Sequence, residues 1–278
     1  MKKFYLLILL IMSTSISQAQ VRLMTYNIKY ANENDGENSW SQRKDWVANQ
    51  IGFHEPDIFG VQEALLEQLQ FLKSELKGYE YLGLSREGGE TGEYSALFYD
   101  TDQFEVLKQD TFWLSETPDT VSQGWDAAYK RICTYALFRE KESGQEFWVF
   151  NTHFDHMGDQ ARSESAKLII DKIEELNEKG LPLVLMGDLN LEPSTEPIAL
   201  LSSRFNDSRE KSTGVVFGPE GTFNAYEFHT PVTRRIDYIF TDKESEVLKY
   251  GVLSDSKELR YPSDHFPVLV EVNFKDSE

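Results

Sequence analysis

Residues 181–190 carry the feature that most constrains what this chain can fold into. Residues 183–186 form a short apolar run, about the length of a strand that is buried on both faces. Gly187, Asp188 and Asn190 follow this run directly. Side chains two positions apart on an extended chain point to the same side, so a carboxylate and a carboxamide are expected together where the strand ends. Taken alone, the pattern is equally typical of a strand followed by an Asx-type turn.

The same arrangement, an apolar stretch bounded by a polar group, recurs along the chain. Polar groups at strand ends tend to gather where loops hold them on the rigid edge of a sheet. Carboxylates at such an edge suit a divalent ion, and imidazoles and amides suit phosphoryl oxygens. The pattern therefore predicts one site for a divalent metal and a phosphate. Its candidate residues are Asn27, Glu63, His153, Asp188, Asn190, Asp237, Asp264 and His265.

Six short motifs follow one another along the chain. They are Thr25-Tyr-Asn27, Gln62-Glu63, Asn151-Thr-His153, Gly187-Asp-Leu-Asn190, Ile236-Asp237 and Ser263-Asp-His265. In this order they resemble the motif set of the endonuclease/exonuclease/phosphatase superfamily, which includes deoxyribonuclease I, abasic-site endonucleases, deadenylases, neutral sphingomyelinases and inositol polyphosphate phosphatases. The resemblance covers residues 21–274, and segments 112–118 and 124–128 resemble a secreted bacterial subgroup.

Short strand-like segments with helix-like segments between them predict an α+β or layered α/β fold. The resemblance narrows this expectation to α+β with a four-layer α/β/β/α sandwich, in which two mixed sheets pack face to face with helices outside. The motifs run from Asn27 to His265 and must meet in space, and no Pro/Gly/Ser linker separates them. We therefore expect one catalytic domain over residues 20–278.

The resemblance implies that Glu63 is a metal ligand, because a hard ion such as Mg²⁺ or Mn²⁺ prefers carboxylate oxygen. Asn27 is expected beside it, either as a ligand or as a group that orients Glu63 and Asp188. Asp264 is expected as a further ligand. The alternative for Glu63 is a helix cap, since a helix is predicted to begin at residues 64–65.

For the chemical step, the resemblance implies that Asp188 positions the attacking water and is one of two candidates for the base. Asn190 would donate to a phosphate oxygen or to the leaving group. His153 and His265 are expected to contact non-bridging oxygens, and Asp237 is expected to hold His265 in one tautomer. Whether Asp188 or His265 is the base stays open.

Arg131, Arg162 and His156 are further candidates for binding the substrate phosphate, although ordinary solvated charge is an equal interpretation for the two arginines. Lys29 is a departure from one branch of the superfamily. It stands two positions after Asn27, where abasic-site endonucleases carry an aspartate that binds the metal. This difference disfavours a function in abasic-site repair.

Residues 114–130 form the longest irregular stretch and carry Trp125 and Tyr129. Aromatic rings in a loop either pack over the core or line a pocket that stacks a base, a sugar or a lipid headgroup. Packing over the core is our expectation here. The glycine-rich segment 86–92 lacks the Lys-Ser/Thr pair of a P-loop, so we expect it to be a mobile loop at the rim of the site.

Residues 1–19 combine two lysines, the apolar run 4–12 and Ser17-Gln-Ala19, which is the pattern of a secretory signal peptide. The run is too short for an anchoring helix, which needs about 20 apolar residues. The sequence therefore predicts export to the periplasm or the medium without a stable membrane anchor. The formal net charge of −19 opposes tight nonspecific binding of nucleic acid but leaves local binding at a cleft open.

These features predict an exported, divalent-metal-dependent hydrolase of phosphate esters, with a phosphodiesterase or nuclease as the leading hypothesis. The phosphate-ester substrate is the partner that the sequence indicates, and no partner protein can be deduced from it. One alternative keeps the chemistry but uses a lipid or sugar phosphate, as a phosphatase or sphingomyelinase does. A second alternative is a catalytically inactive binding module, which the completeness of the polar set disfavours.

Overall fold

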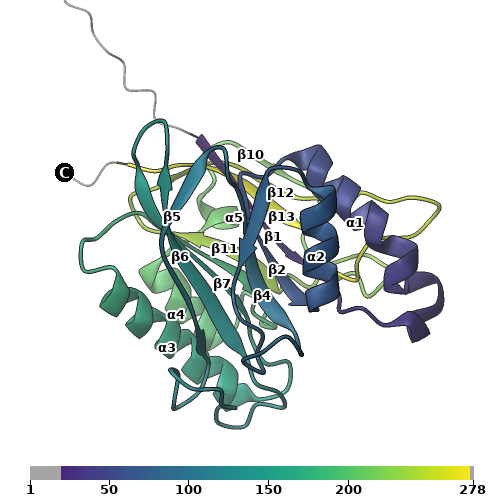
Figure 1. The fold of residues 1–278 in the computed structure, drawn as a ribbon, viewed down its shortest axis with the longest axis horizontal. Coiled ribbons are helices and arrows are strands. Elements are labelled where there is room, and N and C mark those ends of the chain that lie inside the picture. Colours follow the sequence, from purple (N-terminus) through teal and green to yellow (C-terminus); the bar gives the residue numbers. More distant parts are fainter. Residues whose placement is uncertain (1–19, 276–278) are drawn as a thin grey trace, which may run out of the picture.

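Residues 20–275 are described in the structure, a computed structural model. They form two β-sheets that pack face to face (Figure 1). The predicted signal peptide, residues 1–19, lies outside the described residues. The seven-stranded sheet contains, in spatial order, β10 (Val215–Phe217), β12 (Glu246–Val252), β13 (Val268–Asn273), β1 (Gln20–Asn27), β2 (Ile58–Ala64), β4 (Tyr94–Asp100) and β3 (Tyr79–Leu82). The six-stranded sheet contains β5 (Phe104–Trp113), β6 (Ile132–Glu140), β7 (Glu146–His153), β8 (Leu183–Asp188), β11 (Asp237–Thr241) and β9 (Asn206–Asp207).

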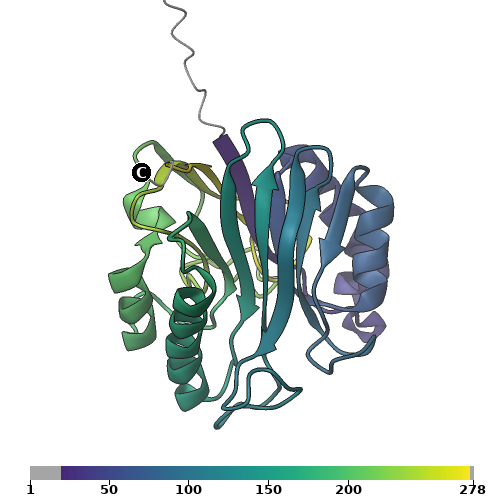
Figure 2. The ribbon, with the colours of Figure 1, turned by 60° about the vertical axis from the view of Figure 1, so that its left-hand side comes forward.

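Helices cover the outer face of each sheet. In α1 (Trp40–His54) and α2 (Leu66–Glu75), apolar residues at helical spacing pack against the seven-stranded sheet. In the same way, α3 (Asp159–Leu176) and α4 (Glu196–Arg204) cover the six-stranded sheet. Figure 2 shows the two pairs of helices on opposite sides of the strands. This is a four-layer α/β/β/α sandwich, so the expected fold class is confirmed.

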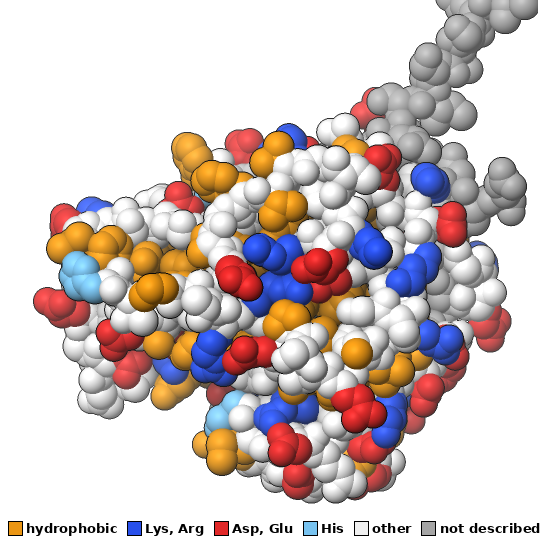
Figure 3. Space-filling model, turned by 180° about the vertical axis from the view of Figure 1, so that it is seen from behind, with side chains coloured by type: hydrophobic (Ala, Val, Ile, Leu, Met, Phe, Trp, Pro, Cys, Tyr) orange, Lys and Arg blue, Asp and Glu red, His pale blue; other side chains and the backbone are white. Residues whose placement is uncertain are grey.

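The remaining short helices, η1 (Glu33–Asn38) and α5 (Ser208–Lys211), lie in connections. None of the helices within residues 20–275 combines the length and the hydrophobicity of a membrane span. On the face seen in Figure 3, basic side chains lie beside acidic ones, so positive charge does not form a continuous track there.

Strand alternation explains why polar groups collect between the sheets. On β8, Leu183 and Leu185 face the helices, whereas Val184 and Met186 lie in the apolar core between the sheets. Asp188 continues the row of Val184 and Met186, because it is the next residue of the same parity. The row of side chains that points between the sheets therefore changes from apolar to polar toward one end of the strand.

Strand pairing brings the ends of these rows to one edge. Asp188 is paired with His153 on the parallel strand β7 and with Asp237 on the antiparallel strand β11. In the other sheet, Asn27 is paired with Gln62 on β2. The register alone therefore assembles residues from distant parts of the chain.

A buried amide pair joins the two sheets directly beneath this edge. Gln62 Nε2 on β2 donates to Asn151 Oδ1 on β7 at 2.6 Å and to Thr25 Oγ1 on β1 at 3.0 Å. Asn151 Nδ2 donates to the carbonyl oxygens of Val61 and Ala96 at 3.1 and 2.9 Å. These bonds fix the spacing of the sheets where the site is built.

Gly60 gives a test of this spacing. A Cβ at Gly60 would lie 2.5 Å from Cγ of Asn151, whose side chain is held by hydrogen bonds at both ends. We expect Gly60→Ala to lower the free energy of unfolding by about 1–3 kcal/mol, as overpacking of a core does. Urea denaturation measures this change.

Gly52→Ala is the matched control. A Cβ at Gly52 in α1 would make ordinary contact with Leu76 at 3.5 Å, and alanine stabilises a helix interior by about 0.5–1 kcal/mol relative to glycine. Equal stability of Gly60→Ala and Gly52→Ala would show that the interface under the site adjusts freely.

Candidate active site

A cavity of about 430 Å³ opens at the edge where the polar strand ends meet. The structure brings the predicted residues together there. Glu63, His153, Asp188, Asn190, Asp264 and His265 line the cavity, together with the candidate phosphate-binding residues Arg131 and His156. Asn27 and Asp237 are fully buried and hydrogen-bond to the lining residues from beneath.

Asp188 lies at the centre of the site. Its Oδ1 accepts a hydrogen bond from the backbone N–H of Asn190 at 2.9 Å, and its Oδ2 accepts one from Asn27 Nδ2 at 3.0 Å. Nε2 of His153 and Nε2 of His265 lie 3.5 and 3.7 Å from the same Oδ2. Burial, with the nearby charge of Asp237, raises the pKa of Asp188 to about 7.

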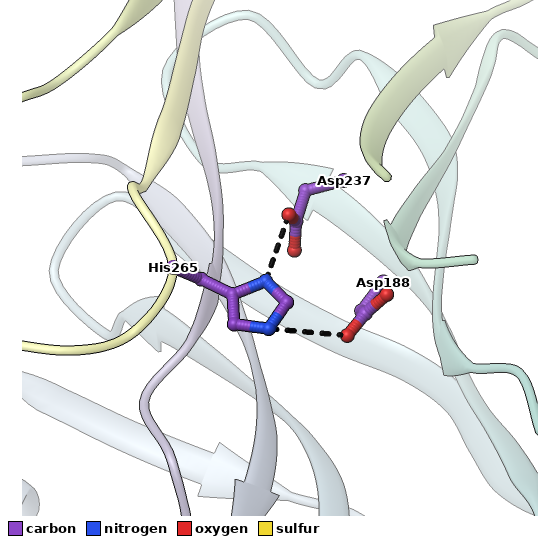
Figure 4. A group of neighbouring side chains, drawn as sticks. All are labelled: Asp188, Asp237 and His265. Atoms are coloured by element: carbon purple, nitrogen blue, oxygen red, sulfur yellow. Dashed lines mark hydrogen bonds and ion pairs between the residues drawn. The ribbon is translucent and has the colours of Figure 1, made fainter. Parts of the chain in front are cut away.

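His265 lies between two carboxylates (Figure 4). Its Nδ1 is 2.9 Å from Asp237 Oδ2, and its Nε2 faces Asp188. Burial opposes the charged form, but Asp237 and Asp188 outweigh this effect and raise the pKa of His265 to about 10. Thr222 Oγ1 accepts hydrogen bonds from the backbone N–H groups of Ile236 and Asp237, both at 3.1 Å, and so fixes the start of β11.

Asp188, Asp237 and His265 also have the composition of a metal site, because one ligand atom from each lies within 4.8 Å of the others. Nδ1 of His265 is already hydrogen-bonded to Asp237 Oδ2 at 2.9 Å, and its Nε2 lies 3.7 Å from Asp188 Oδ2. We therefore interpret this group as a hydrogen-bonded unit that orients His265.

The tautomer of His153 follows from its neighbour. The guanidinium of Arg131 only donates, and its Nη1 lies 3.0 Å from His153 Nδ1. Burial, reinforced by the charge of Arg131, holds the pKa of His153 well below its usual range. The ring is therefore neutral, with Nδ1 as acceptor and the proton on Nε2.

Asn190 and His153 then present two donors side by side. Asn190 Nδ2 donates to the carbonyl oxygen of Phe154 at 3.1 Å, which fixes the orientation of its amide. The same Nδ2 lies 3.1 Å from His153 Nε2, which also carries a proton. Two donors do not bond to each other, so this corner of the cavity is complementary to an acceptor oxygen from a ligand.

Glu63 reaches the cavity because β2 is irregular. Phe59 and Val61 face the helices, so strict alternation would send Glu63 to the same face. A register shift between Val61 and Ala64 and a left-handed backbone at Glu63, with φ of 61°, turn its carboxylate toward the cavity instead. Glu63 does not cap the following helix, because α2 begins at Leu66.

The donor set around Glu63 fits a hard divalent ion, since Glu63 and Asp264 both line the cavity with carboxylate oxygens. Lys29 Nζ lies 3.9 Å from a carboxylate oxygen of each. Burial raises the pKa of Asp264. Burial also opposes ionisation of Glu63, but Lys29 and the hydrogen bond from Asn27 outweigh it and lower the pKa of Glu63.

Asn27 makes the contacts of an orienting group, and its role as a metal ligand stays a prediction. Its Nδ2 donates to Glu63 Oε1 and to Asp188 Oδ2, both at 3.0 Å, and its Oδ1 accepts from the backbone N–H of Lys29 at 3.0 Å. In this arrangement the amide positions two carboxylates, and its oxygen keeps a second lone pair. Glu63 and Asp264 are the carboxylates that would hold a metal.

Arg162 is not brought to the cavity. Its Nη1 donates to the carbonyl oxygen of Asp155 at 3.1 Å, and its Nη2 pairs with Asp159. Asp155 is buried and accepts hydrogen bonds from the backbone N–H groups of Met157 and Gly158 at 2.9 and 2.8 Å. Arg162 thus supports the turn before α3, and Arg131 is the arginine of the predicted pair that lines the site.

Sequence reasoning missed one side of the cavity. Arg86, Glu93, Tyr129 and Phe223 line it, although the rings of 114–130 were expected to pack over the core. That expectation is wrong for Tyr129, which is 50% exposed. Loops that follow no repeated pattern deliver these residues, and the one available signal was an aromatic ring placed two residues before Arg131.

Over residues 24–265 the chain matches the model of the Endonuclease/Exonuclease/phosphatase family. The chain therefore belongs to the endonuclease/exonuclease/phosphatase family, whose members are phosphoesterases that use divalent metal ions. Among solved structures it is similar to the Bacteroides thetaiotaomicron VPI-5482 mannosyl-6-phosphatase Bt3783, with 42% identity, a TM-score of 0.87 and coverage of 91% of this chain and 99% of that one.

The chain is also similar to two proteins to which no function is assigned. A functionally unknown conserved protein from Enterococcus faecalis V583 is 33% identical, with a TM-score of 0.86 and coverage of 92% of this chain and 100% of that chain. The uncharacterized protein L388 of Acanthamoeba polyphaga mimivirus is 29% identical over 161 residues, which are 55% of this chain. The match spans 60% of that viral protein, less than two thirds of its length.

Lys29 gives a test of the metal site. A unit charge about 4 Å from another contributes about 4 kcal/mol at an effective dielectric constant of ~20, and the ammonium lies 3.9 Å from both carboxylates. We expect Lys29→Met to tighten Mg²⁺ binding at least about tenfold, about 1.4 kcal/mol, because the competing cation is removed. Isothermal titration calorimetry measures this affinity.

The control for Lys29→Met is Lys167→Met, which removes an exposed ammonium on α3 and should leave the Mg²⁺ affinity unchanged. If Lys29→Met binds Mg²⁺ with unchanged or weaker affinity, the metal site lies away from Glu63 and Asp264.

Asp155 gives a prediction for stability against pH. Burial opposes its ionisation, but hydrogen bonds from Gly158 and Met157 outweigh it and lower its pKa from 3.8 to about 2. The charged form therefore contributes about 2 kcal/mol to stability above pH ~4, which is lost as the pH falls toward ~2. We expect Asp155→Asn to lower the free energy of unfolding by about this amount at pH 7 and by less at pH 3.

Chemical denaturation at both pH values measures the difference, with the exposed Asp171→Asn on α3 as control. A constant difference between Asp155→Asn and the unchanged protein at both pH values would contradict the assignment.

Proposed function

We propose that the protein is an exported, divalent-metal-dependent phosphatase that hydrolyses the phosphate monoesters of sugars. The observation that carries the proposal is the pair of donors at His153 Nε2 and Asn190 Nδ2, 3.1 Å apart, beside the carboxylate of Asp188. This corner would take a phosphoryl oxygen and place the phosphorus near a group that can orient water. The signal-peptide pattern of residues 1–19 supports export.

The choice of a monoester over the phosphodiester favoured from sequence has two supports. The cavity of about 430 Å³ lies in the lower part of the ~300–1,000 Å³ range of small-molecule pockets. The net charge of −19 opposes binding of a long polyanion. The similarity to a mannosyl-6-phosphatase, at 42% identity, agrees with both.

In the proposed reaction, each side chain has a role that follows from its contacts. Asp188, held by Asn27 and by the backbone of Asn190, orients the attacking water toward phosphorus. His153 and Asn190 donate to non-bridging oxygens, where negative charge increases in the transition state. A divalent ion held by Glu63 and Asp264 would supply further positive charge at the phosphoryl group.

His265 acts beside them as a charged donor. Asp237 holds its Nδ1 at 2.9 Å, so Nε2 is directed at the reaction centre. The protonated imidazole stabilises the charge that develops on the phosphoryl oxygens. This role needs Asp237 as a positioning residue, because a free imidazole would rotate and lose its charge.

A substrate panel tests the proposal. We expect mannose 6-phosphate and related hexose phosphates to release inorganic phosphate in a reaction that a chelator stops and Mg²⁺ or Mn²⁺ restores. Asp188→Asn should lower kcat by at least about 100-fold because the water is no longer oriented, a typical loss for one such group. Asp171→Asn, on the exposed face of α3, should retain full activity.

The panel includes RNA, single-stranded DNA, sphingomyelin and bis-p-nitrophenyl phosphate. Turnover of these diesters without turnover of any sugar phosphate would falsify the monoesterase assignment. Full activity of Asp188→Asn would show that the reaction does not take place at this site.

A further inference from the structure

One wall of the cavity has a composition that phosphate binding does not require. It is formed by Arg86, Glu93, Tyr129 and His156. A carboxylate such as Glu93 disfavours an anion nearby, and its oxygen lies 4.0 Å from Arg131, which also contacts His153. A wall of aromatic rings beside a carboxylate that is paired with an arginine, in a cavity for an anion, indicates that the rest of the ligand is neutral and carries hydrogen-bond donors.

The rings of this wall lie close to the phosphate end of the cavity. Arg131 connects the two, with Nη1 at 3.0 Å from His153 Nδ1 and Nη2 at 3.3 Å from His156 Nδ1. The rings of His156 and Tyr129 are nearly parallel, with centroids 5.8 Å apart and an interplanar angle of 18°. A group esterified to the phosphate would therefore lie within reach of the aromatic pair.

Hydrogen bonds and a cation–ring contact hold this wall in place. The guanidinium of Arg86 lies 4.9 Å from the centroid of Tyr129, and its Nη1 donates to Glu93 Oε2 at 2.8 Å. The backbone N–H of Arg86 donates to the carbonyl oxygen of Glu93 at 2.9 Å, and Trp113 Nε1 donates to the carbonyl oxygen of Arg86 at 2.8 Å. The backbone N–H of Tyr129 is bonded to Asp155 at 3.3 Å.

Exposure of Tyr129 gives a second reason to assign a ligand here. Half of its surface is exposed, although a tyrosine ring gains stability from burial and pairs its hydroxyl when buried. Rings that face a cavity, with a few charged groups at fixed positions, are the usual lining of a small-molecule pocket.

We propose that Tyr129, His156, Arg86 and Glu93 form the subsite for the sugar ring of the substrate. The C–H face of a pyranose packs on the Tyr129–His156 pair, and its hydroxyl groups donate to Glu93 and accept from Arg86. This inference rests on the proposed phosphatase function, and it names a single hexose ring as the leaving group. The cavity of about 430 Å³ has room for a ring and a phosphate.

Binding without turnover tests the subsite. In protein that carries Asp188→Asn, with Mg²⁺ present, we expect mannose 6-phosphate to bind at least tenfold more tightly than inorganic phosphate by calorimetry. Adding Tyr129→Ala or Glu93→Gln should reduce this ratio to below about threefold without weakening the binding of inorganic phosphate. Tyr129→Phe keeps the ring and should retain the ratio.

Phe53→Ala is the matched control, because it removes an aromatic ring that is 82% exposed on α1 and should leave the ratio unchanged. In the otherwise unchanged enzyme, Tyr129→Ala should raise KM for mannose 6-phosphate about tenfold and change kcat/KM for ethyl phosphate less than twofold. This split distinguishes a ligand contact from a general loss of structure.

Three outcomes overturn the subsite. The first is equal affinity for mannose 6-phosphate and inorganic phosphate, and the second is a preference that survives both Tyr129→Ala and Glu93→Gln. The third is tighter binding of adenosine 5′-monophosphate than of mannose 6-phosphate, with the difference lost in Tyr129→Ala. That result would assign the wall to a nucleotide base instead of a sugar. If the unchanged enzyme binds sugar phosphates tightly but does not hydrolyse them, the proposed function is wrong and the subsite stands.

Discussion

The site depends on one buried amide. Asn27 Nδ2 donates to Glu63 in its own sheet and to Asp188 in the facing sheet, both at 3.0 Å. The two carboxylates would otherwise repel each other. The same residue is tied to the last loop, because its carbonyl oxygen accepts from Ser263 Oγ at 2.7 Å. Groups that would hold a metal and groups that would act on phosphate are thus positioned by one side chain.

Positive charges balance the acids at this edge of the sandwich. Lys29 faces Glu63 and Asp264, Arg131 faces Asp155, and the imidazolium of His265 lies between Asp188 and Asp237. Burial strengthens each of these interactions and also makes an unpaired charge costly. A dianionic substrate and a divalent cation would enter together most easily, because the pair adds little net charge to the cavity.

Regular strands explain how much could be predicted. Inward rows on β1, β7, β8 and β11 follow a period of two, so Asn27, His153, Asp188 and Asp237 were predicted to meet, and they do. The stacking of the sheets came from the family resemblance, since periodicity does not specify which faces pack. Arg162 and Tyr129 were misjudged because loop geometry decides their direction, and local sequence carries little information about it. The sequence also showed no sign of the bulge that turns Glu63, although the Gln62-Glu63 motif placed Glu63 at the site correctly.

The position of the metal tests the central claim most directly. A crystal grown with Mn²⁺ and inorganic phosphate would locate the ion by its anomalous scattering. We predict one peak in contact with the carboxylates of Glu63 and Asp264, and a phosphate bonded to His153 Nε2 and Asn190 Nδ2. A peak bound instead by Asp188, Asp237 and His265, with phosphate remote from His153, would contradict the arrangement on which the proposed chemistry depends.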